Sequence, residues 1–114
     1  MMPKPSISSQ ARNDLKEIKR YISKELCNPQ AAKNVATRIK TRIDSLSQSP
    51  EIGVSLDFLT ETLSDYRVLV CGNYNVFYYC KGDRAYIDRI LYGKRDYAKL
   101  LFDDSRGEEL IHAD

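Results

Sequence analysis

The chain has 114 residues and a net charge of +2, which predicts one small domain with a modest hydrophobic core. No apolar run is long enough to span a membrane, and the first residues lack the apolar stretch of a signal peptide. We therefore expect a cytoplasmic protein without membrane contact. Three scattered cysteines and one histidine favour neither a disulfide framework nor a metal site, and no cofactor is expected.

Charge is distributed unevenly along the chain. Basic residues outnumber acidic ones over residues 1–50 and again over residues 65–102, whereas residues 103–114 are mostly acidic. We expect a single domain over residues 1–102 that carries an acidic polar tail over residues 103–114. A basic body is suited to nucleic acids or to acidic proteins, and this mild excess does not choose between them.

The N-terminal part of the chain predicts a short strand followed by a helix. Residues 5–8 are compatible with an edge strand, and Ser8 or Ser9 is a suitable N-cap. The stretch from about residue 9 to residue 26 is amphipathic, because its apolar residues recur at helical spacing. These apolar residues are Leu15, Ile18, Ile22 and Leu26.

A second helix follows after a short connection. Asn28 and Pro29 indicate its start, since asparagine is a good cap and proline is favoured in the first turn. The apolar period then continues to about Ser47, and Pro50 and Gly53 end it. Two helices joined by so short a connection predict an antiparallel hairpin.

The second half of the chain predicts a sheet. Residues 51–64 have no clear period and are expected to form a loop, with a helical turn over residues 57–63 as an alternative. Three strand-like segments follow at residues 66–70, 74–80 and 85–91. The turns between them are too short for parallel crossovers, so these strands are expected to form an antiparallel meander.

The order of elements predicts the fold class. A strand, two helices and three strands are followed by residues 96–102, which predict a short terminal helix or an extended docking arm. We expect an α+β fold in which the helix hairpin covers one face of a small antiparallel sheet.

Three stretches of the sequence resemble a known family. They are DLKEI followed by YI at residues 14–22, SPEIG at residues 49–53, and the strand-rich run that ends in IDRILYGKRD at residues 87–96. In this order and spacing they resemble the RelE/ParE superfamily of bacterial type II toxin–antitoxin systems. The long hairpin and the Pro-Glu-x-Gly loop are most similar to the ParE-like branch.

The resemblance implies a toxin of the plasmid-stabilisation type that arrests growth and is neutralised by a cognate antitoxin. ParE-like members act by binding DNA gyrase and perform no chemistry themselves. RelE-like members are mRNA interferases, which cut mRNA on the ribosome. The ParE-like activity is favoured here. A ribosome-dependent endoribonuclease and a decayed toxin that only binds its antitoxin remain alternatives.

A nuclease would need a base for the ribose 2′-hydroxyl, cations for the developing phosphorane charge and an acid for the leaving oxygen. The resemblance transfers these roles, for a nuclease only, to Arg67, Tyr92, Lys94 and Arg95. Leu69 and Asn75 stand where nuclease members have cations, and Leu101 stands near the position of their terminal-helix tyrosine. These three replacements favour a binding toxin.

For a binding toxin, the resemblance places target contacts at the end of the last strand and beyond it, at Lys94, Arg95, Tyr97 and Phe102. Contacts with an acidic antitoxin are expected on the first helix, at Lys16, Lys19 and Arg20. Structural alternatives remain. The helix cations are also compatible with a solvated face, and Arg95 with a structural pair to Asp96.

Overall fold

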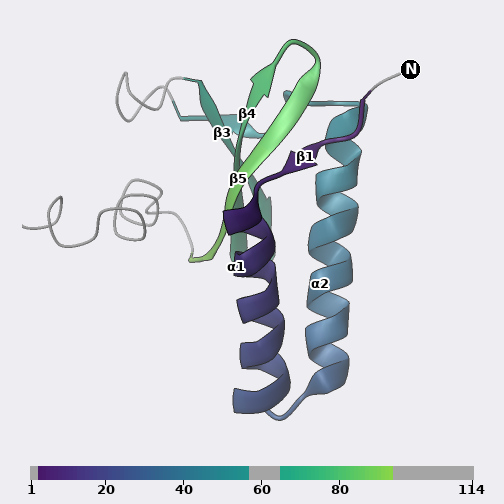
Figure 1. Ribbon diagram of the computed structural model, residues 1–114, viewed down its shortest axis with the longest axis vertical. Coiled ribbons are helices and arrows are strands. Elements are labelled where there is room, and N and C mark those ends of the chain that lie inside the picture. The colour runs from purple at the N-terminus through teal and green to yellow at the C-terminus, as the bar shows by residue number, and fades with distance from the viewer. Residues whose placement is uncertain (1–2, 57–64, 94–114) are drawn as a thin grey trace, which may run out of the picture.

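The computed structural model describes residues 3–56 and 65–93. Two antiparallel helices lie side by side against one face of an open sheet (Figure 1). The helices are α1 (Ser9–Arg20) and α2 (Pro29–Asp44), and the sheet has five strands in the order β1-β5-β4-β3-β2. Its strands are β1 (Ser6–Ile7), β2 (Val54–Ser55), β3 (Tyr66–Cys71), β4 (Tyr74–Lys81) and β5 (Arg84–Tyr92). This confirms the predicted α+β class.

Helix α1 begins where the cap residues predict. The Ser8 hydroxyl oxygen accepts a hydrogen bond from the Ala11 N–H at 3.0 Å, so Ser8 is the N-cap. After Arg20 the backbone widens into a π-helical turn, η1 (Tyr21–Glu25). The helical segment therefore extends about as far as predicted, but its final turn is not α-helical.

Helix α2 also follows the sequence signals. The Asn28 carboxamide oxygen accepts a hydrogen bond from the Ala31 N–H at 3.0 Å, and Pro29 occupies the first turn. The helix ends in a single 3-10 turn, η2 (Ser45–Ser47), which agrees with the predicted end near Ser47. None of the helices among the described residues is long and apolar enough to cross a membrane.

The predicted antiparallel meander is confirmed for β3, β4 and β5. The prediction of a wholly antiparallel sheet was wrong, because β1 pairs parallel to β5, with Ser6 opposite Tyr86 and Ile7 opposite Ile87. The pairing covers part of the otherwise free edge of β5, and the Ser8 N–H extends it by donating to the Ile87 carbonyl at 3.0 Å. A two-residue strand carries too little pattern to reveal its partner or its direction.

The segment predicted as a loop over residues 51–64 contains a short strand. Strand β2 pairs with β3, with Val54 opposite Val68 and Ser55 opposite Arg67. The chain needs these hydrogen bonds because β3 would otherwise have an unpaired edge. The predicted helical turn at residues 57–63 and the predicted terminal element at residues 96–102 lie outside the described residues.

The main core lies between the helices and the sheet. Helix α1 contacts β5 and α2 contacts β3, and the interior between these layers is apolar. Its fully buried side chains include Ile39, Ile43, Leu46, Val76, Tyr78 and Ile87. On the opposite face of the sheet Phe77 is buried, and Tyr79 stacks on Tyr86 with ring centroids 5.4 Å apart. The strand aromatics thus serve packing between strands.

Candidate functional site

The last strand ends in an exposed tyrosine. Tyr92 is 65% exposed, and its ring meets that of Tyr74 edge to face at a centroid distance of 5.4 Å. Gly93 then leaves the strand with φ 153°, and its N–H donates to the Asn73 carbonyl at 3.0 Å. This contact fixes the position from which the chain continues into the Lys-Arg-Asp motif.

The positions at which nuclease members carry cations are buried here. Leu69 is 3% exposed and belongs to the core under the helices. Asn75 is fully buried, and its carboxamide Nδ2 donates to the Gly93 carbonyl at 3.0 Å. A lysine or arginine at either position would carry its charge into a dry environment, which is costly without a paired anion. Both positions therefore support the fold in this chain.

Arg67 binds the backbone of the loop before β2. Its Nη1 donates to the Gly53 carbonyl at 2.8 Å and to the Glu51 carbonyl at 3.2 Å. A guanidinium has several donors in a fixed planar arrangement, so it can hold two carbonyls of one loop at once. Of the predicted catalytic residues, Arg67 is thus one with a defined structural role.

Tyr78 binds the same loop through its side-chain hydroxyl. Its hydroxyl donates to the Pro50 carbonyl at 2.8 Å and accepts from the Gly53 N–H at 2.8 Å. Burial raises the pKa of this hydroxyl, and the hydrogen bond from Gly53 partly opposes that rise. A Cβ atom at Gly53 would lie 2.5 Å from the Tyr78 oxygen, so no side chain fits there. The Pro-Glu-x-Gly motif is therefore fixed by packing.

The structure does not bring Arg67 and Tyr92 together. Arg67 is opposite Tyr78 on β4, whereas Tyr92 is opposite Tyr74 at the other end of the same strand. Four residues of strand separate these two positions by about 13 Å. The other predicted catalytic or target-binding residues lie outside the described residues; they are Lys94, Arg95, Tyr97 and Phe102. The composition of a catalytic or target-binding site therefore stays a prediction.

A largely buried ion pair joins α1 to β5. The two carboxylate oxygens of Asp14 accept from Nε and Nη2 of Arg89 at 2.8 Å each, and both side chains are 12% exposed. One of these oxygens also accepts from the Ile90 N–H at 2.9 Å. Sequence reasoning missed this pair, because no spacing rule links residues 75 positions apart. It fixes the side of α1 that faces the sheet.

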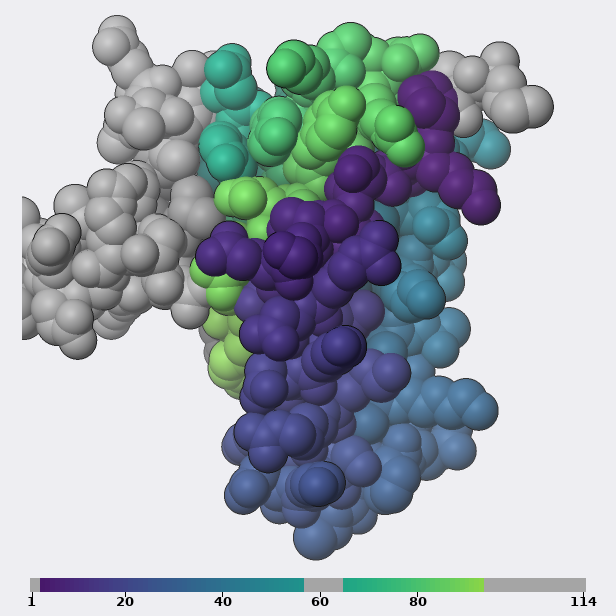
Figure 2. Space-filling view, viewed as in Figure 1, coloured from purple at the N-terminus to yellow at the C-terminus, as the bar shows by residue number. Residues whose placement is uncertain are grey.

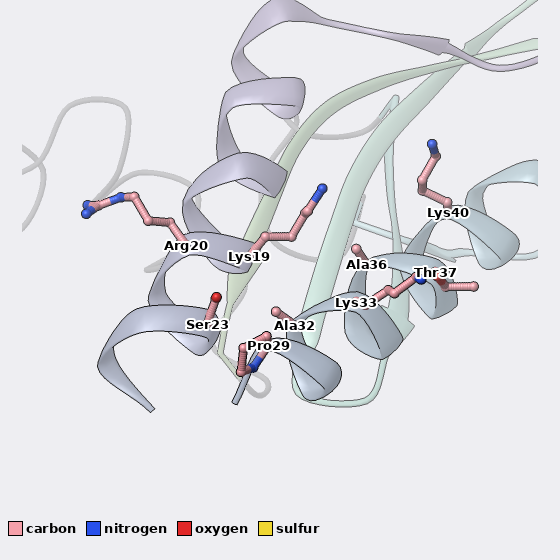
Figure 3. A pocket seen from close by; sticks show the side chains of 9 residues that line it. All are labelled: Lys19, Arg20, Ser23, Pro29, Ala32, Lys33, Ala36, Thr37 and Lys40. Carbon is pink, nitrogen blue, oxygen red and sulfur yellow. The ribbon is translucent and has the colours of Figure 1, made fainter. Parts of the chain in front are cut away.

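The opposite side of α1 borders a groove shared with α2 (Figures 2 and 3). One part of the groove has a volume of about 470 Å³ and lies between the C-terminal end of α1 and the facing turns of α2. The other part, about 310 Å³, continues toward β1 and β5. Lys19 and Lys40 line both parts, so the two parts form one continuous surface.

The predicted antitoxin-binding residues lie at this groove. Lys16 and Lys19 line it. Arg20 lines the 470 Å³ part and also forms an exposed ion pair with Glu17, in which Nη2 and Oε1 are 3.1 Å apart. Three further cations line the groove and were not predicted from the sequence. They are Arg12, Lys33 and Lys40. The helical period of α2 places Lys33 and Lys40 seven residues apart on one face, and that spacing was the available signal.

Comparisons with known proteins agree with this architecture. Residues 6–97 match the family described as the ParE toxin of the type II toxin–antitoxin system parDE. In fold the chain is similar to the solved structure of the chromosomal ParDE TA system from P. aeruginosa, with a TM-score of 0.68 at 20% sequence identity. That similarity covers 82% of this chain and 98% of the other. No curated protein matches the chain.

The family match spans most of the chain, and the fold is that of a ParDE structure. The chain therefore belongs to the ParE toxin family of type II toxin–antitoxin systems. The resemblance that the three sequence stretches indicated is confirmed at this level.

Proposed function

We propose that this chain arrests growth by binding DNA gyrase in the cytoplasm, and that a cognate antitoxin neutralises it. Membership of the ParE family supports a toxin. Gyrase is the target that ParE-like members imply, and the binding mode requires no catalytic residues from this chain. A ribosome-dependent endoribonuclease and a decayed toxin are the outcomes that would replace this proposal.

The observation that carries the choice is the burial of Leu69 and Asn75. Cleavage of RNA needs cations near the reacting phosphate, because negative charge develops there in the transition state. Leu69 supplies none, and the Asn75 side chain is used to hold the Gly93 carbonyl. Arg67 adds to this argument, since two loop carbonyls already engage its guanidinium.

Target contacts are proposed beyond Gly93, at Lys94, Arg95, Tyr97 and Phe102. Two cations, a tyrosine and a phenylalanine are side-chain types enriched at protein interfaces or suited to acidic surfaces. Arg95 is the residue we expect to matter most, because a guanidinium can bind a carboxylate with two parallel hydrogen bonds.

The test is controlled expression without the antitoxin, followed by growth measurement and mapping of mRNA 5′ ends. We expect growth arrest with intact mRNA, and we expect Arg95→Ala to relieve the arrest. Lys81→Ala, at the exposed last residue of β4, is the matched control and should stay toxic. New cuts clustered within translated codons and absent in Arg95→Ala would instead identify a nuclease. The absence of any arrest would indicate a decayed toxin.

Antitoxin binding is tested separately from toxicity. Reversing the charges of Lys16, Lys19 and Arg20 together should weaken the complex with the antitoxin, because an acidic segment loses its partners. The remaining affinity should also depend less on salt. If the affinity is unchanged across a salt series, this side of α1 is not part of the interface.

A further inference from the structure

Three tyrosines from different elements gather at one end of the sheet. Tyr74 begins β4 and is opposite Tyr92, the last residue of β5, and their rings meet edge to face at a centroid distance of 5.4 Å. Burial raises the pKa of Tyr74, and Tyr92 and then Tyr21 raise it further, so both other tyrosines lie close to it. We call Tyr21, Tyr74 and Tyr92 the tyrosine patch.

The tyrosine patch lies on the side of α1 that faces the sheet. Tyr21 follows Asp14 by seven residues, or about two helical turns, so the two side chains point in nearly the same direction. Asp14 faces the sheet through its pair with Arg89. Lys19 lines the groove toward α2, and two residues separate it from Tyr21 by about 200° around the helix. The patch is therefore separate from that groove.

The tyrosine patch is largely exposed. Tyr92 is 65% exposed and Tyr21 is 56% exposed. Leu26, whose N–H donates to the Tyr21 carbonyl at 3.2 Å across the π-helical turn η1, is also 56% exposed. Figure 1 shows α1 continuing past the end of the sheet at which β5 ends, so the sheet does not cover this part of the helix. Exposed apolar patches mark interaction sites, and π-helical turns are frequent at functional sites.

Cations border the tyrosine patch. Arg42 on α2 donates to a carbonyl of β3 at 3.3 Å. Burial raises the pKa of the Cys71 thiol at the end of β3, and Arg42 and Arg38 oppose that rise, which places both guanidinium groups near this end of the sheet. After β5 the sequence continues into Lys94 and Arg95. A partner surface that fits the patch is therefore apolar at its centre and acidic at its border.

The chain leaves the tyrosine patch from a defined position. The Gly93 N–H donates to the Asn73 carbonyl, and the Asn75 carboxamide donates to the Gly93 carbonyl, each at 3.0 Å. The target contacts proposed above follow directly after Gly93. A partner that binds them begins its contacts beside Tyr92.

We propose that the tyrosine patch anchors the interface with DNA gyrase and fits an apolar pocket of gyrase that acidic side chains border. Tyrosine is enriched among the residues that dominate binding energy at interfaces. A covered tyrosine buries about 150–250 Å², so Tyr21 and Tyr92 together can add roughly 200 Å², about a quarter of one partner's share of a standard interface.

Gyrase is favoured over the antitoxin as the occupant for two reasons. The patch is continuous with the proposed target contacts, and it lies on the opposite side of α1 from the proposed antitoxin contacts. This inference rests on the proposed function, since it names the surface by which the target is held.

The first test removes the exposed rings. Tyr21→Ser with Tyr92→Ser should raise at least tenfold the concentration of chain that half-inhibits supercoiling of a relaxed plasmid by purified gyrase. Tyr21→Phe with Tyr92→Phe should stay within about twofold of wild type, because the rings remain. The matched control is Ile52→Ser with Val54→Ser, which removes two exposed apolar side chains beside β2 and should also stay within about twofold. All variants should keep the circular dichroism spectrum and melting temperature of the wild type, because the changed side chains are exposed.

The second test needs no variant. Hydroxyl radicals oxidise exposed tyrosine rings, and mass spectrometry of the wild-type chain measures the rate of oxidation at each residue. Added gyrase should protect Tyr21 and Tyr92, whereas Ile52 and Val54 should stay as reactive as in the chain alone.

The outcomes separate this inference from the function on which it rests. If the wild-type chain does not inhibit gyrase, the proposed function fails. If the wild type inhibits and the serine variant inhibits equally well, only the tyrosine patch is rejected. Protection of the tyrosines by purified antitoxin and not by gyrase would replace gyrase by the antitoxin. Protection by plasmid DNA alone would replace it by nucleic acid, and protection that rises with the concentration of the chain alone would replace it by a second copy.

Discussion

Helix α1 uses charge differently on its two sides. Toward the sheet, Asp14 forms a bidentate pair with Arg89 and also accepts from the Ile90 N–H, at a site where both side chains are 12% exposed. Toward α2, Lys16 and Lys19 border a groove without acidic neighbours among the described residues that line it. The residues that form these two sides lie only a few positions apart in the sequence.

The difference shows how to distinguish charged side chains that stabilise the fold from charged side chains that are available to bind a partner. A buried charge must be paired and hydrogen-bonded, because an isolated one would be expensive to remove from water. Asp14 meets this condition through three hydrogen bonds. Exposed lysines need no partner for folding, so a cluster of them without neutralising acids is better explained by binding than by stability.

The largest expected effect comes from breaking the largely buried pair of Asp14 with Arg89. Asp14→Ala removes the carboxylate that accepts hydrogen bonds from the Arg89 guanidinium and from the Ile90 N–H. We expect a loss of about 3–5 kcal/mol in the free energy of unfolding, measured by urea denaturation. Glu17→Ala is the control on the same helix. It removes an exposed pair with Arg20 and should cost at most about 1 kcal/mol. Equal losses in the two variants would contradict the distinction between the two sides of α1.

A smaller loss is expected at the loop that Tyr78 fastens. Tyr78→Phe removes a donor to the Pro50 carbonyl and an acceptor for the Gly53 N–H, and leaves both groups without this partner. The expected cost is about 1–3 kcal/mol in the free energy of unfolding. Tyr79→Phe changes the same chemical group on the neighbouring residue, which stacks on Tyr86, and should cost less. A smaller loss for Tyr78→Phe than for Tyr79→Phe would show that the loop is not held by this hydroxyl.

The paired charge of Asp88 on β5 predicts an effect of pH. The Tyr66 hydroxyl donates to Asp88 at 3.1 Å, and burial together with that carboxylate raises the pKa of Tyr66 to about 12. The unfolded chain ionises this tyrosine near pH 10, so its contribution is complete below pH 10 and is lost as the pH rises toward 12. Tyr66→Phe should reduce the fall in unfolding free energy between pH 10 and pH 12. An identical fall in both proteins would contradict the assignment.

The smallest effect on stability is expected on the lysine side. Neutralising Lys16, Lys19, Lys33 and Lys40 together to glutamine should change the free energy of unfolding by no more than about 0.5 kcal/mol per site. The direction is toward greater stability, because repulsion around the groove is removed. Thermal denaturation of this variant beside the wild type provides the measurement. A large loss would mean that the lysines belong to the fold.

Much of the fold was predictable because its signals are local. The caps at Ser8 and Asn28 and the apolar periods of both helices concern residues within a few positions of one another. The parallel pairing of β1 with β5 was not predictable, since two residues carry no usable period. Strand β2 was missed for the same reason.

The candidate site was predicted less completely, and the reason is its dependence on distant contacts. The role of Arg67 is set by loop carbonyls that precede it by more than ten residues, and the Asp14 pair joins the two halves of the chain. By contrast, Lys16 and Lys19, which were predicted as antitoxin contacts, share one side of α1 as the helical period implies, and both line the groove. Their partner residues on α2 required the hairpin to be assembled first.

The most direct test of the account is a supercoiling assay with purified DNA gyrase and the full chain. A binding toxin should inhibit supercoiling in proportion to the amount of chain added. Addition of the antitoxin should restore the activity, and Arg95→Ala should inhibit far less than wild type. Gyrase that remains fully active at a saturating concentration of folded chain would contradict the proposed target.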